Sequence, residues 1–257
     1  MKKTTQLLLA TALMGTATFS MAEKTLQIGV EGAYPPFSEV NKDGEVVGFD
    51  IDIANALCAE MKRKCELKKV AWDGMIPALK GRKIDAIIAS MSATEKRKKS
   101  IDFTDRYYRI PVKVIRKKGS GVEFNKEAMK GKIIGVQKST PFSDHMQDLF
   151  GEVAEIKRYA SNDEALLDLQ AGGVDVVAAE SLVLQEGFLK KPEGANFEFF
   201  GPDLVEEKYY GQGIAIGIRK KQDALKESFN KAIKAIRENG KYKEINDKYF
   251  DIDVYGE

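Results

Sequence analysis

The sequence is poor in the side chains that build metal centres and thiol or imidazole catalysis. Its 257 residues include two cysteines, one histidine and one tryptophan, and no CxxC pair. Zinc centres and activated nucleophiles usually draw on several cysteine, histidine or acidic side chains set at close spacing. We therefore predict no metal site and no cofactor, and we expect a protein that is not an enzyme.

Long apolar runs are also absent. The longest, Leu7–Gly15, follows Lys2 and Lys3 and precedes the small-x-small sequence Ser20-Met21-Ala22. This run is too short to span a membrane, and the arrangement is that of a cleaved secretory signal peptide. We predict a signal peptide over residues 1–22 and a mature chain without a membrane span, exported to the periplasm. The residue directly after the predicted cleavage site is Glu23 and not a cysteine, which argues against a lipid anchor.

The chain has no excess of charge of either sign. It holds 41 Lys and Arg against 39 Asp and Glu, and removal of Lys2 and Lys3 leaves the mature chain near neutral. Nucleic-acid-binding domains usually carry a clear basic excess. We therefore expect no nucleic-acid partner. The 235 residues of the mature chain suffice for two lobes with separate cores.

The two cysteines, Cys58 and Cys65, lie seven residues apart in a region with helix-turn-strand character. In an oxidising compartment such a pair is expected to form a structural disulfide. Two free thiols or a metal site are the other interpretations of the pair.

The most informative segment is Asp85–Arg97, with the sequence DAIIASMSATEKR. A short apolar run followed by hydroxyl residues and a helix start is typical of a buried parallel strand. Ser90, Ser92 and Thr94 would lie at its carboxyl end, where open α/β sheets bind ligands. Arg97 adds a planar set of donors suited to a carboxylate. The segment therefore predicts a carboxylate site, although a plain strand, a capped helix and a surface arginine would give the same pattern.

A second segment resembles the first. Residues Ala78–Ser90 align without gaps to Asp168–Glu180, sharing a leucine, a glycine, an aspartate and a small apolar strand. The matched last positions are Ser90 and Glu180. Unless the similarity is due to chance, the chain uses one helix-strand unit twice, which predicts two facing lobes and a cleft between them.

The pattern of strands and helices along the whole chain supports two lobes. Two series of alternating strands and helices predict an α/β protein of bilobal architecture with discontinuous domains. We expect the first lobe to comprise residues 23–110 and 212–257, and the second residues 111–211. A two-segment hinge is predicted near Arg109–Pro111 and Gly211–Gly213.

Several segments together resemble one known family over essentially the whole mature chain. They are GVEGAYPPF (29–37), GFDIDIA (48–54), WDGMIPAL (72–79), SMSATEKR (90–97) and FDIDVYG (250–256). The chain resembles the periplasmic solute-binding proteins of polar amino-acid ABC transporters, most of all those for lysine/arginine/ornithine and for histidine. The resemblance implies a periplasmic binding protein fold of type II. It also implies a monomer that closes on an amino acid and delivers it to an inner-membrane ABC permease.

The resemblance also implies which residues hold the backbone of the amino acid. Arg97 would bind the α-carboxylate, assisted by Ser90, Ser92 and Thr140, and Glu180 would bind the α-ammonium. The same two subfamilies share a disulfide at the positions of Cys58 and Cys65.

The side chain of the ligand would lie between Tyr34 and Trp72, with its cationic end at Glu31. The lysine/arginine/ornithine pattern has Asp where this chain has Glu31 and Glu180, and Ser where it has Ala89. Charge is kept at both acids, so a cationic amino acid (arginine, lysine, ornithine or histidine) is still expected.

Two other ligand classes and one reaction remain as alternatives. Glu31 within EGAY, followed by WDG, is also similar to opine-binding relatives, and a neutral polar amino acid would suit the same fold. Cyclohexadienyl dehydratases resemble this fold too, and Glu31 or Glu180 could then serve as a general acid. The sole histidine, His145, lies in a polar helical segment and is predicted to be on the surface.

Overall fold

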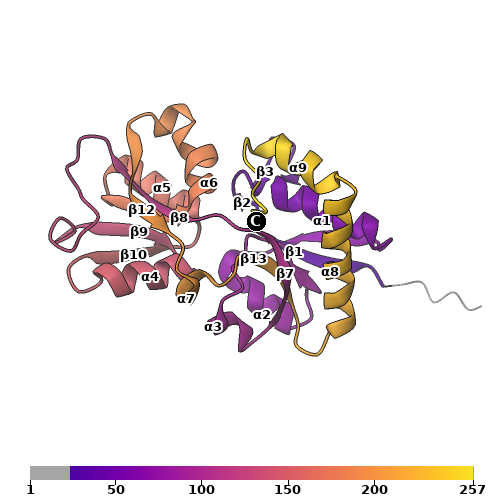
Figure 1. The fold of residues 1–257 in the computed structure, drawn as a ribbon. Coiled ribbons are helices and arrows are strands. Elements are labelled where there is room, and N and C mark those ends of the chain that lie inside the picture. Colours follow the sequence, from indigo (N-terminus) through magenta and orange to yellow (C-terminus); the bar gives the residue numbers. More distant parts are fainter. Residues whose placement is uncertain (1–23, 257) are drawn as a thin grey trace, which may run out of the picture.

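The structure is a computed structural model and describes residues 24–256; the predicted signal peptide lies outside the described residues. Two five-stranded sheets, each flanked by helices, form two lobes (Figure 1). In the first lobe the strand order is β5 (Cys65–Lys69), β1 (Leu26–Val30), β6 (Ala86–Ile87), β13 (Ile214–Ile218) and β7 (Asp102–Tyr108). Its longer helices are α1 (Phe49–Glu60), α2 (Met75–Lys80), α8 (Asp223–Glu238) and α9 (Lys241–Tyr249).

The second lobe repeats this plan. Its strand order is β10 (Glu155–Tyr159), β9 (Ile133–Gln137), β11 (Val176–Glu180), β8 (Val112–Lys117) and β12 (Phe197–Leu204). Its helices include α4 (Pro141–Phe150), α5 (Asn162–Ala171) and α6 (Ser181–Leu184), the last continued by a π-helical turn, η2 (Gln185–Leu189), and a 3-10 turn, η3 (Pro192–Gly194).

The two sheets have the same pattern of strand directions. In each, a central strand pairs in parallel with two neighbours: β1 with β5 and β6, and β9 with β10 and β11. The fourth strand, β13 or β8, runs antiparallel. The segments in which the sequence shows a repeat end in β6 and β11, which hold the same place in the two sheets. Ligands bind beyond the carboxyl ends of such strands, so each sheet contributes one wall of a cleft.

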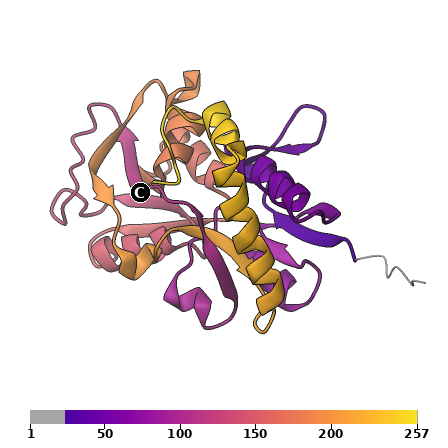
Figure 2. The same ribbon diagram turned by 45° about the vertical axis from the view of Figure 1, so that its right-hand side comes forward.

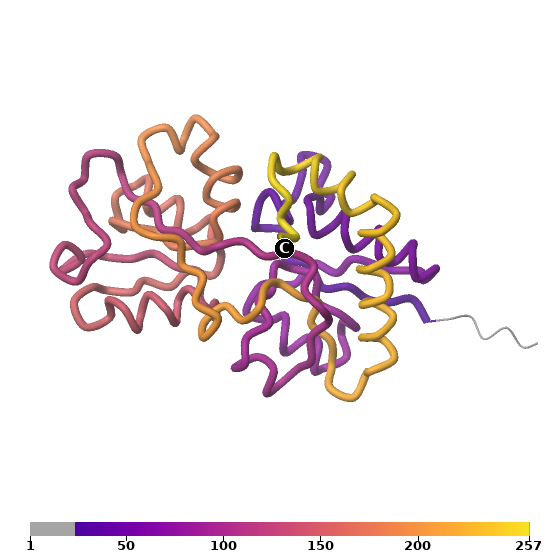
Figure 3. Tube along the Cα trace, in the orientation of Figure 1, coloured from indigo at the N-terminus to yellow at the C-terminus, as the bar shows by residue number. Residues whose placement is uncertain are grey.

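Two connections join the lobes (Figure 3). The first is residues 109–111, between β7 and β8. The second is residues 205–213, between β12 and β13, and it contains a short helix, α7 (Glu207–Tyr210). Strands β7 and β12 each lie at one edge of their sheet, next to β13 and β8, and their residues alternate poorly between apolar and polar.

A small third sheet closes one side of the first lobe. It consists of β2 (Ala33–Tyr34), β3 (Ser38–Val40) and β4 (Val46–Val47). The turn Asn41–Gly44 joins β3 to β4, and the main-chain N–H of Asn41 donates to the carbonyl of Glu45 at 2.8 Å.

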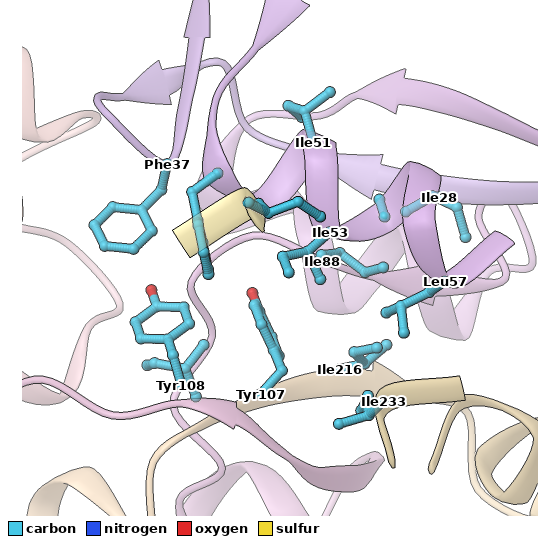
Figure 4. Close-up of a cluster of buried hydrophobic side chains, with 14 of the residues drawn as sticks. Ile28, Phe37, Ile51, Ile53, Leu57, Ile88, Tyr107, Tyr108, Ile216 and Ile233 are labelled. Atoms are coloured by element: carbon cyan, nitrogen blue, oxygen red, sulfur yellow. The ribbon is translucent and has the colours of Figure 1, made fainter. Parts of the chain in front are cut away.

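The core of the first lobe lies between the sheet and helices α1, α8 and α9, which pack on one another (Figure 2). Aromatic rings gather at its cleft end, where Phe37 stacks on Tyr108 at 5.0 Å (Figure 4). Leu182 and Val183 of α6 join this core from the second lobe. Cys58 of α1 and Cys65 of β5 form the predicted disulfide, which ties the helix to the edge strand.

Candidate functional site

The nine predicted ligand residues line one cavity between the lobes. From the first lobe come Glu31, Tyr34, Trp72, Ala89, Ser90, Ser92 and Arg97, and from the second Thr140 and Glu180, joined by Gln137, Pro141 and Phe142. The space is narrow: about 10 Å³ is open to a water-sized sphere, which is room for about one water molecule. An amino acid can therefore enter only if the lobes separate or these side chains rearrange.

Arg97 lies in α3 (Glu95–Lys98), a helical turn whose N-cap is Thr94. Its guanidinium donates to the main-chain carbonyl of Ser92 at 3.0 Å and, across the cleft, to that of Ser139 at 3.0 Å. The group lies 5.1 Å from the ring centre of Trp72. Burial lowers the pKa of Arg97 to about 10, so it stays cationic at neutral pH. Two of its five N–H donors are used, which leaves a forked set for a carboxylate.

Each lobe places a serine in a left-handed backbone conformation at the cleft. Ser90 follows β6 with φ +52°, and Ser139 follows β9 with φ +60°. Such angles are uncommon for residues with a Cβ and gather at functional sites. Thr140, next to Ser139, is the N-cap of α4: its hydroxyl accepts from the Ser143 amide and donates to the Gln137 carbonyl at 2.7 Å.

Two glutamates face the cavity from opposite lobes. Glu31 follows β1, and Glu180 ends β11. Burial raises the pKa of each carboxyl group to about 8. Glu180 accepts hydrogen bonds from the hydroxyl groups of Tyr34 and Tyr108, the latter at 3.3 Å. These bonds partly offset the rise in the pKa of Glu180 that burial causes. Desolvated carboxyl groups of this kind are costly unless a cation or a proton neutralises them.

The predicted aromatic pair is present at the cavity. Tyr34 lies in β2, and Trp72 begins the 3-10 turn η1 (Trp72–Gly74). The indole N–H of Trp72 is buried and has no hydrogen-bond partner among the described residues. Ala89 lines the cavity with a methyl group only, so this position offers no hydroxyl.

Two residues that the sequence analysis did not single out belong to this polar network. Gln137, the last residue of β9, donates its side-chain N–H to Glu31 across the cleft at 2.6 Å. Asp50, fully buried at the start of α1, accepts from the hydroxyl groups of Ser90 at 2.9 Å and Tyr107 at 2.8 Å. Burial raises the pKa of Asp50 to about 7, although the two hydrogen bonds act in the opposite direction and lower it. The GFDIDIA segment contains Asp50, but nothing in its spacing indicates that the side chain points inward.

The prediction for His145 is wrong. The residue is only 2% exposed, because its ring stacks on Tyr209 at 3.9 Å and its Nδ1 lies 2.8 Å from the Tyr210 hydroxyl. Both tyrosines belong to α7 in the second connection. The polar neighbours of His145 in the sequence concealed this contact, since the covering element lies 60 residues further along the chain.

Exposed ion pairs join the lobes around the cavity. Lys96 of α3 pairs with Asp144 of α4 at 2.6 Å, and Lys138 pairs with Asp73 at 2.6 Å. Between residues 24 and 256, no cluster of histidine, cysteine and acidic side chains is placed to hold a metal ion. No helix in the same range has the length and apolar character of a membrane span.

Comparison with known proteins shows which proteins this chain resembles. The sequence profile of the bacterial extracellular solute-binding proteins, family 3, matches residues 26–252. The chain is 47% identical over 249 residues to an L-arginine-binding protein of Pseudomonas aeruginosa, covering 96% of each. It is 39% identical over 247 residues to a histidine-binding periplasmic protein of Escherichia coli, covering 94% of this chain and 93% of that protein.

A solved structure agrees with these sequence matches. An ancestral arginine-binding protein bound to arginine has a TM-score of 0.81 and 34% identity, with 88% of this chain and 98% of that chain covered. The known relatives named here are binding proteins. With the fold, the cleft and the matched length in agreement, the chain belongs to the bacterial extracellular solute-binding proteins, family 3.

Proposed function

We propose that this protein binds a cationic L-amino acid, with arginine foremost, between its two lobes. The observation that carries the proposal is the charge of the cavity lining, which holds one guanidinium, Arg97, and two carboxyl groups, Glu31 and Glu180. Together they carry a net charge of −1 when ionised, which a ligand with one carboxylate and two cationic groups neutralises. A neutral amino acid would leave one buried carboxylate unpaired, and that is costly.

The backbone of the amino acid is held by groups from both lobes. Arg97 binds the α-carboxylate through the N–H donors that are not bonded to the carbonyl groups of Ser92 and Ser139. Ser92 contributes a further contact to the same carboxylate. The hydroxyl proton of Thr140 is engaged by the Gln137 carbonyl, so Thr140 contributes its main-chain N–H at the start of α4. Glu180 accepts from the α-ammonium group.

The side chain of the amino acid lies between Tyr34 and Trp72 and ends at Glu31. An aromatic face attracts a guanidinium or ammonium group by about 0.5–2 kcal/mol. Gln137, which already contacts Glu31, can turn its amide toward the same cation. Arginine is placed first because the relative from Pseudomonas aeruginosa and the solved ancestral protein are both arginine binders.

Ligand binding favours the closed arrangement of the lobes. The lobes are residues 23–110 with 212–257, and residues 111–211, hinged at the two connections between the sheets. The ligand bridges Arg97 of the first lobe and Glu180 of the second, and it shifts the balance only by its stronger affinity for the closed form. The closed form is then presented to an inner-membrane ABC permease.

The protein works as a monomer in the periplasm after removal of residues 1–22. Membership of an extracellular family and the charged, apolar and small-residue regions of the N-terminus support this location. The mass of the protein recovered from a periplasmic extract tests the cleavage site.

Calorimetric titration against the twenty amino acids, ornithine, citrulline and octopine tests the ligand class. We expect tight binding of arginine, lysine or ornithine. The variant Glu31→Gln should weaken these ligands by at least about tenfold, the range for a hydrogen bond to a charged group, and spare glutamine. Glu39→Gln, an exchange in the small third sheet outside the cavity lining, is the matched control.

Other results would change the proposal in defined ways. An equal loss for cationic and neutral ligands in Glu31→Gln would remove Glu31 as the side-chain contact. Binding of octopine alone would favour an opine ligand. We propose that the protein is not an enzyme, since carboxylate and cation pairing accounts for its buried charges; turnover of prephenate would contradict this.

A further inference from the structure

Behind the cavity wall, Asp50 and Ser90 form a buried pair that the proposed ligand contacts do not use. Asp50 is fully buried in α1, and its Oδ2 atom lies 2.9 Å from the hydroxyl of Ser90. Ser90 itself lines the cavity. Asp50, which does not line the cavity, therefore contacts a residue that does.

The donors around Asp50 fix the direction of this hydrogen bond. The second carboxyl oxygen receives the hydroxyl of Tyr107 at 2.8 Å, and the main-chain N–H of Ser90 is also directed at Asp50 and Tyr107. Figure 4 shows the hydroxyl oxygens of Tyr107 and Tyr108 pointing to the same side of the core. Asp50 is thus surrounded by donors, the arrangement that suits a carboxylate.

A serine hydroxyl has one proton and two lone pairs. A second acceptor near the Ser90 hydroxyl is the hydroxyl oxygen of Tyr108, and a carboxylate is the stronger acceptor of the two. When Asp50 is ionised, the hydroxyl proton of Ser90 is therefore donated to Asp50, and only the lone pairs of the hydroxyl remain for the cavity. Lone pairs attract an ammonium group and repel a carboxylate.

We infer that Asp50 is a positioning residue that makes the Ser90 hydroxyl an acceptor for the ligand α-ammonium. The inference rests on the proposed function and refines it. It moves Ser90 from the α-carboxylate, where the family resemblance placed it, to the α-ammonium beside Glu180. Ser90 has a left-handed backbone, φ +52°, its hydroxyl contacts Asp50, and the residue lines the cavity.

Three related ligands distinguish contacts with the α-carboxylate from contacts with the α-ammonium group. They are L-arginine, agmatine, which lacks the α-carboxylate, and 5-guanidinopentanoate, which lacks the α-ammonium. The variants are Ser90→Gly, which keeps the left-handed backbone without strain, Asp50→Asn, and the double variant. Tyr107→Phe is the matched control, because it removes the other side-chain hydrogen bond of Asp50 and keeps the hydrogen bond between the Ser90 hydroxyl and Asp50.

Calorimetry should show a loss of roughly 10- to 100-fold for L-arginine and agmatine in Ser90→Gly, and roughly 10-fold in Asp50→Asn. Binding of 5-guanidinopentanoate should change by less than about threefold, as should all three ligands in Tyr107→Phe. The double variant should lose no more than Ser90→Gly alone, because the two residues act as one unit. Melting curves without ligand confirm that each variant is folded.

Two results would overturn the inference. If Ser90→Gly weakens 5-guanidinopentanoate and spares agmatine, the hydroxyl serves the carboxylate. If Asp50→Asn weakens all three ligands equally, Asp50 has a structural role only. Wild-type protein that binds neither L-arginine nor L-lysine would instead refute the proposed function, which separates the two failures.

Discussion

At the scale of single residues, Arg97 shows how a charged group can be buried at a binding site. Two main-chain carbonyl groups, one from each lobe, and the face of Trp72 surround its guanidinium. The planar fork can satisfy these partners and still present two parallel donors. A lysine offers a point charge with three donors and no such plane.

Exchange of this residue for lysine is therefore not conservative. Arg97→Lys keeps the charge but loses the forked contact, and one of the two carbonyl groups is left without its donor. We expect L-arginine affinity to fall by roughly 100-fold, about 3 kcal/mol, in calorimetric titration. The melting temperature without ligand should fall only slightly. Lys96→Arg, a charge-conserving exchange at the exposed neighbour, should leave affinity unchanged, and similar affinities in the two variants would contradict the role of Arg97.

The residues that the sequence could predict are those whose function is tied to local chain geometry. Ser90, Arg97 and Thr140 follow strands or begin helices, so their place at the cleft follows from the order of elements alone. Asp50, Gln137 and His145 differ, because their roles depend on contacts with elements 23 or more residues away in sequence. No local spacing encodes such contacts, and the burial of His145 was mispredicted for this reason.

At the scale of elements, helix α4 connects the cavity to the second connection between the lobes. Its first turn is capped by Thr140, which lines the cavity, and His145, one turn further, stacks on Tyr209 of α7. The Tyr209 hydroxyl also donates to Asp148 of α4 at 2.7 Å. The helix therefore holds α7 against the second lobe.

Removal of the imidazole should loosen this contact. His145→Ala leaves the Tyr210 hydroxyl without its partner and opens a space beside Tyr209, which should lower the free energy of unfolding by about 2–4 kcal/mol in urea. Tyr209→Phe keeps the ring stack and loses two exposed hydrogen bonds, one to Asp148 and one from Lys208, so it should cost less than about 1 kcal/mol. Equal losses in the two variants would show that the ring stack contributes little.

At the scale of the whole molecule, Glu31 and Glu180 from opposite lobes meet in one narrow cavity, and Asp50 is buried behind its wall. Burial raises the pKa of Glu31 and Glu180 to about 8 and that of Asp50 to about 7, and the negative charge of Asp50 also raises the pKa of both glutamates. In the unfolded chain these groups return to ordinary values near 4. Between about pH 4.5 and 8 the folded, closed protein therefore binds more protons than the unfolded chain does.

This difference sets the sign of the pH dependence. Stability falls with rising pH wherever the folded state binds more protons, so the ligand-free melting temperature should decrease from pH 5.5 to pH 8. A bound cationic amino acid supplies the positive charge that protons otherwise provide, so saturating L-arginine should flatten the curve. Glu31→Gln removes one titrating group and should give a shallower ligand-free slope than the wild-type protein. A ligand-free melting temperature that is constant over this range would contradict the raised pKa values of these carboxyl groups in the folded protein.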